Sequence, residues 1–100
     1  MEFFSPYMDR ITQLCRQHQV AVLYAFWSSV KGKMRPESDV DLLFELRSTD
    51  PHEFADNYWA LASKLEAMFG RHVDLISRRA LRNKYFIEQV EGEKVKLYEA

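Results

Sequence analysis

Cysteine pairs, long apolar runs and a surplus of either charge are all missing from this sequence, and each absence excludes a class of protein. Among 100 residues there is one cysteine, Cys15, so no internal disulfide forms and a reducing compartment is expected. No apolar run approaches the ~20 residues that span a membrane. The first ten residues include Glu2 and Asp9 and lack the basic start and apolar core of a signal peptide. We therefore expect a cytoplasmic protein without a membrane segment.

Charge is nearly balanced, because 14 Lys and Arg residues face 15 Asp and Glu residues and the net charge is −1. Without a basic surplus there is no general attraction to nucleic acid, so direct nucleic-acid binding is not expected. What the chain does have is a hydrophobic fraction of 47% with 14% aromatic residues, which indicates a globular protein rather than a disordered one. A chain of this length supports one core, and we expect a single domain over residues 1–100.

Alternating strand-like and helix-like segments predict an α/β (α+β) domain with a mixed sheet covered by helices on one face. Ser5-Pro6 and Asp50-Pro51 are typical helix starts, and Gly70 is a typical helix end. The basic segment after Ser77 is expected to form a further helix, with Ser77 as its cap. The expected strands are residues 20–26, 40–46 and 73–76, with an edge strand over residues 94–98.

Asp39 and Asp41 begin the second expected strand and are separated by one residue. Side chains two residues apart on a strand point to the same face, so we expect the two carboxylates to lie together. They repel each other unless a cation lies between them, and oxygen ligands suit Mg²⁺. Upstream, Ser28 and Ser29 close the first strand, where hydroxyls and free N–H groups at the start of a following helix favour a phosphate. A metal pair beside a phosphate site is typical of phosphoryl or nucleotidyl transfer.

Lys31 lies in a basic connector with Lys33 and Arg35, just before Pro36. Two interpretations of Lys31 are equally supported: a solvated side chain in a polar loop, or a cation that neutralises a triphosphate.

Asp74 interrupts the apolar run of the third expected strand. A buried carboxylate is costly unless it is paired or bound to a metal. One interpretation is a salt bridge to Arg78 or Arg79. The favoured one is a functional carboxylate that works with Asp39 and Asp41 at a metal site.

The order of Ser28, ten intervening residues and Asp39-x-Asp41 resembles the Gly-Ser…Asp-x-Asp signature of the DNA polymerase β-like nucleotidyltransferases. With Phe26 before the turn and the later His72-Val73-Asp74-Leu75-Ile76, the chain resembles the small MNT-type (minimal nucleotidyltransferase) antitoxins, which are encoded beside HEPN-domain toxins. The likeness runs from about residue 23 to the C-terminus.

This resemblance implies a small nucleotidyltransferase fold and transfer of AMP from ATP to a hydroxyl group. It implies that Asp39, Asp41 and Asp74 are catalytic residues and Mg²⁺ ligands, and that Asp74 also helps to deprotonate the acceptor. Ser28, with the backbone around it, is expected to hold the β- and γ-phosphates. Ser29 and Lys31 complete the expected ATP-binding residues.

The resemblance also implies a partner, because MNT antitoxins bind a HEPN ribonuclease toxin and family members adenylylate a toxin tyrosine. One residue departs from the family pattern: Trp27 stands where the motif has glycine. Glycine lets the backbone approach a phosphate closely, and tryptophan does not. The alternative hypothesis is therefore a domain that has lost catalysis and neutralises its toxin by binding alone.

Overall fold

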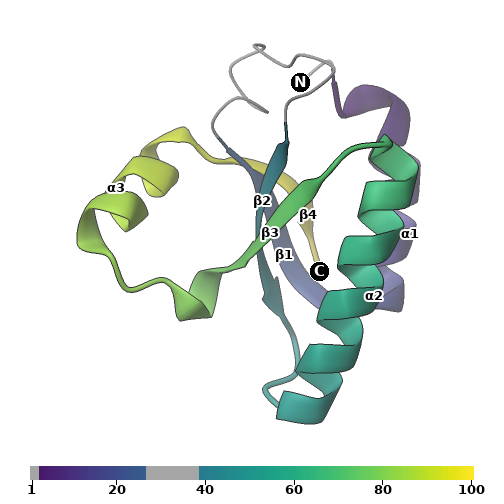
Figure 1. The fold of residues 1–100 in the computed structure, drawn as a ribbon, viewed down its shortest axis with the longest axis horizontal. Helices are drawn as coiled ribbons and strands as arrows, with labels where there is room; N and C mark the ends of the chain where they lie inside the picture. Colours follow the sequence, from purple (N-terminus) through teal and green to yellow (C-terminus); the bar gives the residue numbers. More distant parts are fainter. Residues whose placement is uncertain (1–2, 27–38) are drawn as a thin grey trace.

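The computed structural model describes residues 3–26 and 39–100, and within them it shows a four-stranded sheet between helices (Figure 1). The sheet has the order β3-β2-β1-β4. The helices in this part of the chain are the 3-10 turns η1 (Ser5–Tyr7) and η3 (Arg78–Ala80) and the α-helices α1 (Met8–Gln17), α2 (Pro51–Phe69) and α3 (Lys84–Glu93). The strands are β1 (Val20–Ala25), β2 (Val40–Leu46), β3 (Val73–Ser77) and β4 (Val95–Glu99).

The sheet is mixed, as predicted. β1 pairs antiparallel with both β2 and β4, whereas β2 pairs parallel with β3. A parallel pair needs a crossover between its strands, and α2 supplies it. None of the helices in residues 3–26 and 39–100 has the length and apolar character that a membrane span requires.

Alternation along β2 separates the two faces of the sheet. Val40, Leu42 and Phe44 are fully buried in the main core, where they pack with α1 and α2. The intervening positions, Asp41 and Leu43, therefore face the other way. The main-core positions of β2 and its acidic positions therefore lie on opposite faces of the sheet.

α3 lies on the opposite face of the sheet from α1 and α2 (Figure 1). There Val90 of α3 packs with Leu43 and with Phe26, which directly follows β1, in a second, smaller core. The prediction that helices cover one face of the sheet holds for α1 and α2 but is corrected for α3, which covers the other face. The physical reason is that this second face also carries large apolar side chains, which are stabilised by burial under a helix.

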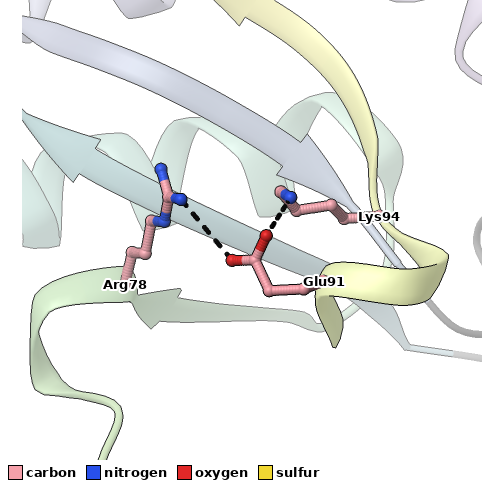
Figure 2. A network of polar contacts seen from close by, with 3 residues as sticks. All are labelled: Arg78, Glu91 and Lys94. Carbon is pink, nitrogen blue, oxygen red and sulfur yellow. Dashed lines mark hydrogen bonds and ion pairs between the residues drawn. The ribbon is translucent and has the colours of Figure 1, made fainter. Parts of the chain in front are cut away.

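A polar network fastens α3 to this face (Figure 2). Glu91 forms ion pairs with Arg78, at 3.5 Å, and with Lys94. Both cations also lie over the ring of Tyr24 on β1, at 5.6 Å for Arg78 and 4.9 Å for Lys94. The hydrogen bond from Lys94 is the main cause that lowers the pKa of Glu91. Burial opposes this shift, and the charges of Lys94 and Arg78 add to it.

The start of the last helix differs from the prediction. Ser77 occupies the N-cap position of the short turn η3, but its side chain makes no capping hydrogen bond there. The helix α3 begins later, after Asn83, whose side-chain oxygen accepts a hydrogen bond from the Phe86 N–H at 3.0 Å. At the N-terminus, Ser5 and Pro6 likewise start a 3-10 turn rather than α1 itself. In both places a 3-10 turn precedes the α-helix.

Both ends of α2 are as predicted. The Asp50 carboxylate accepts hydrogen bonds from the N–H groups of His52, at 2.8 Å, and Glu53, at 3.3 Å. At the other end Gly70 adopts φ 69°, a left-handed conformation that suits glycine. α2 is therefore terminated on both sides by its own sequence.

We predict that Asp50→Ala lowers the free energy of unfolding by about 1 kcal/mol, since it leaves two N–H groups of the first turn without their side-chain acceptor. Urea denaturation followed by circular dichroism measures this change. Asp56→Ala is the control, because Asp56 is an exposed carboxylate of the same helix beyond its first turn. Equal stability losses in the two variants would contradict the capping role.

Candidate active site

Asp41 and Asp74 are direct neighbours across the parallel pair of β2 and β3. Adjacent strands lie ~4.8 Å apart, and paired residues of parallel strands point to the same face. The two carboxylates therefore project side by side from the face opposite α1 and α2. The structure thus places Asp74 beside Asp41, as the favoured interpretation of the sequence required.

Asp39 precedes β2 by one residue and completes the acidic group. Its side chain is exposed, as is that of Asp74, whereas Asp41 is half-buried. Partial burial, followed by the negative charges of Asp74 and Asp39, raises the pKa of Asp41 to about 6, and His72 opposes this slightly. The neighbouring negative charges thus destabilise the ionised form of Asp41, and a bound cation would offset this repulsion.

Asp74 requires a correction, because the sequence suggested a buried carboxylate and the structure has an exposed one. β3 is an edge strand, and only Val73 and Leu75 on its other face enter the main core. The proposed salt bridges are also absent: Arg78 pairs with Glu91, and Arg79 pairs with Glu45 at 3.1 Å. Among the described residues, no hydrogen bond or ion pair engages the Asp74 side chain.

Ser28, Ser29 and Lys31, the expected phosphate-binding residues, lie outside the described residues, as does Trp27. Phe26, directly before Trp27, donates its N–H to the Asp41 carbonyl at 3.2 Å.

Glu66, in the last turns of α2, is a supporting residue that the sequence did not reveal. Its carboxylate accepts a hydrogen bond from the Val73 N–H at 3.0 Å, and the same oxygen lies 2.9 Å from Nδ1 of His72. On the other side of the strand, the His72 carbonyl accepts from the Val40 N–H at 3.0 Å. Glu66 thus fixes the start of β3 immediately before Asp74.

The chemistry of the acidic group suits Mg²⁺. Its donors are carboxylate oxygens, which Mg²⁺ prefers, and their mutual repulsion favours a cation. Within the described ranges, no three His, Cys, Asp or Glu side chains are already gathered as a metal cage. Mg²⁺ is commonly held by one or two carboxylates together with substrate phosphates, so the residues fit an ion that arrives with a nucleotide.

Two other titratable side chains are structural. Cys15 is fully buried in the main core, and burial raises the pKa of its thiol to about 12, so it is no nucleophile. His18 joins the end of α1 to α2, with Nδ1 3.2 Å from the Asn57 side-chain oxygen and Nε2 3.0 Å from the Lys64 ammonium. Both ring nitrogens are engaged, as expected for a packed histidine rather than a metal ligand.

Comparison with known proteins shows the family to which the chain belongs. The family profile described as nucleotidyltransferase domain matches residues 8–97. A Methanocaldococcus jannaschii protein that bears the name of a protein adenylyltransferase is 27% identical, over 86% of this chain and 93% of its own length.

Two solved structures are similar throughout the fold. One, named as a minimal nucleotidyltransferase, is 28% identical with a TM-score of 0.78, over 94% of this chain and 92% of that chain. The other, from a toxin–antitoxin crystal structure with AMP-PNP, is 25% identical with a TM-score of 0.71, over 93% of this chain and 73% of that chain. The predicted fold class is confirmed.

We predict that Asp41→Asn removes a pH-dependent loss of stability. The folded state holds the Asp41 proton more tightly than the unfolded state, because the pKa is about 6 rather than 3.8. Wild-type stability should therefore decline as pH rises between these values and remain lower above them. The variant should lack this component and melt at a higher temperature than wild type at pH 7.5 in the presence of a chelator.

Thermal melting of both proteins between pH 3.5 and pH 8 measures the difference, with Asp56→Asn as a matched change at an exposed site. Parallel pH profiles for wild type and Asp41→Asn would contradict a raised pKa of Asp41 in the folded state.

We further predict that Glu66→Ala loosens the start of β3 and weakens binding of ATP with Mg²⁺, since it removes both contacts of the carboxylate. The expected cost in unfolding free energy is about 1 kcal/mol, because Glu66 is partly exposed. Glu66→Gln keeps an oxygen for the Val73 N–H and should show a smaller effect. Amide exchange at Val73 and calorimetric titration with ATP–Mg²⁺ measure the two consequences, with Glu88→Ala as the exposed control. Unchanged exchange at Val73 would exclude this role.

Proposed function

Because the chain belongs to the nucleotidyltransferase domain family and has the minimal fold of its toxin–antitoxin members, we propose that it transfers AMP from ATP to a protein hydroxyl group. The observation that supports this most is the parallel register that sets Asp41 beside Asp74, with Asp39 two residues before Asp41. Carboxylates gathered in this way can hold the metal ions that the reaction requires.

In the proposed reaction, the acceptor oxygen forms a bond to the α-phosphorus, and the bond from that phosphorus to the bridging oxygen breaks, releasing pyrophosphate. Asp39 and Asp41 hold Mg²⁺, which when bound supplies positive charge against the triphosphate. Asp74 completes the metal site and takes the proton of the acceptor hydroxyl, a role that its exposed position allows. Ser28, Ser29 and Lys31 hold the phosphates.

The proposed acceptor is a tyrosine of a HEPN-domain toxin. Support comes from the similar toxin–antitoxin structure with AMP-PNP and from two exposed aromatic side chains. Trp59 on α2 is 68% exposed and Tyr85 on α3 is 81% exposed, and large aromatic residues at a surface are typical of partner contacts. We also propose that residues 1–100 act as one cytoplasmic domain that needs neither a membrane nor nucleic acid.

The proposal predicts an AMP adduct on the toxin. The chain is incubated with isotopically labelled ATP, Mg²⁺ and a HEPN-domain protein encoded beside it, and the intact mass of the toxin is measured. The double variant Asp39→Asn with Asp41→Asn should show no mass gain, because the loss of both metal-binding carboxylates is expected to lower the transfer rate by roughly a thousandfold or more. Asp56→Asn, matched in chemistry but on the outside of α2, should leave transfer intact. Equal transfer by the double variant and wild type would refute the assigned site.

The second candidate function, neutralisation by binding alone, is favoured by Trp27 in place of the motif glycine. Trp27→Gly separates the two. If the indole is turned away from the phosphates, transfer should change little and the melting temperature should fall, because a buried indole contributes roughly 3–5 kcal/mol. If it occupies the phosphate site, transfer should rise from near zero. Absence of transfer in both proteins, with toxin neutralisation intact, would leave the binding function.

A further inference from the structure

A cavity of about 460 Å³ lies at the far ends of β2 and β3 from the acidic group. Asp41 and Asp74 belong to the first two residues of their strands, whereas the cavity is lined by the last residues, Leu46 and Ser77. Five residues of β2 separate Asp41 from Leu46, about 16 Å, and three residues of β3 separate Asp74 from Ser77, about 10 Å. The strand-end cavity, as we call it, is therefore distinct from the proposed active site.

The strand-end cavity has apolar walls contributed by three separate elements. Leu46 comes from β2, Pro51 and Phe54 from the first turn of α2, and Ala80 from η3. Phe54 is held in place by the main core, where its ring stacks on Phe44 with centroids 5.9 Å apart. The volume lies within the range of roughly 300–1,000 Å³ that binding sites usually have. The cavity is thus shaped by packed elements rather than by loops alone.

The charged side chains of this cavity leave one positive charge without a counterpart among the lining residues. Arg79 and Arg82 line it together with a single carboxylate, Glu45. Glu45 accepts from Nε of Arg79 at 3.1 Å. Arg82 folds back over the turn and donates from one terminal nitrogen to the carbonyls of Arg79, at 2.7 Å, and Leu81, at 2.9 Å.

Both guanidinium groups keep further donors. A guanidinium has five N–H groups, and these contacts use only Nε of Arg79 and one terminal nitrogen of Arg82. In the part of the chain that the structure describes, no other hydrogen bond occupies the remaining donors. They can therefore bind a carboxylate, for which arginine has matching geometry. A single unmatched positive charge suits a monoanion better than a doubly charged phosphate.

We propose that the strand-end cavity binds a peptide segment of a partner protein in which a large apolar side chain adjoins a carboxylate side chain. The apolar side chain contacts Leu46 and Phe54, and the carboxylate meets Arg79 and Arg82. Thr49 and Ala80 are exposed at the cavity, so a segment of a larger chain reaches it from solvent. This inference is independent of AMP transfer, because its residues are not those of the acidic group.

Three blocked dipeptides test the proposal on the complete chain by ¹H–¹⁵N NMR titration. Acetyl-Leu-Asp-amide should shift the amide signals of Thr49, Ala80 and Arg82, with a dissociation constant in the roughly millimolar range expected of so small a ligand. Acetyl-Leu-Asn-amide, which lacks the charge, and acetyl-Ala-Asp-amide, which lacks the large apolar group, should each bind about tenfold more weakly. Equal shifts for all three peptides, or no shifts at these amides, would overturn the proposal.

Variants of the lining locate the binding. Ala80→Phe fills the strand-end cavity and should abolish the shifts, whereas Ala67→Phe, at an exposed alanine of α2 outside the cavity, should not. Arg82→Gln should weaken the binding of acetyl-Leu-Asp-amide and leave the binding of acetyl-Leu-Asn-amide unchanged. This variant also locates the binding in the cavity if Ala80→Phe folds poorly. Undiminished binding to Ala80→Phe, or an equal loss for both peptides in Arg82→Gln, would contradict the assignment.

Discussion

The parallel pairing of β2 with β3 is the constraint on which the candidate site depends. It sets Asp41 and Asp74, which are far apart in sequence, at the same level and on the same face of the sheet. A shift of one residue in this register would turn one of the two carboxylates toward the main core, where Leu42 and Leu75 lie. The apolar alternation of the strands therefore specifies the register. The register in turn places the negative charge of Asp74 beside Asp41, whose pKa is raised first by burial and then by this charge. Core packing and site chemistry are two consequences of one pattern.

The features that could be predicted from the sequence are those set by residues close together in the chain, such as helix caps and alternation along a strand. The caps of α2 at Asp50 and Gly70 and the burial of alternate β2 residues follow from turn chemistry and spacing. The mixed sheet followed from the order of strand-like and helix-like segments, because a helix between β2 and β3 permits a parallel pair.

What could not be predicted depends on contacts between distant segments. The contact of Glu66 with the Val73 N–H joins a helix to a strand across Gly70, and no local pattern marks it. The exposure of Asp74 follows from the position of β3 at the sheet edge, which strand order decides and periodicity does not. The placement of α3 on the second face depends on Val90 finding Leu43 and Phe26, which are remote in sequence.

α2 runs from the strand-end cavity to the end of the sheet that carries the acidic group. Its first turn, at Pro51 and Phe54, lines the strand-end cavity, and its last turns carry Glu66, which fixes β3 beside Asp74. A helix of 19 residues spans about 28 Å as one rigid element, and β2 and β3 run between the same two ends. Leu61 and Leu65 of α2 are fully buried in the main core, where close packing couples the position of the helix to that of the strands. A displacement of the cavity wall along α2 would therefore also displace the carboxylate that holds the start of β3. The strand-end cavity and the acidic group share no residue, but α2 contributes to both.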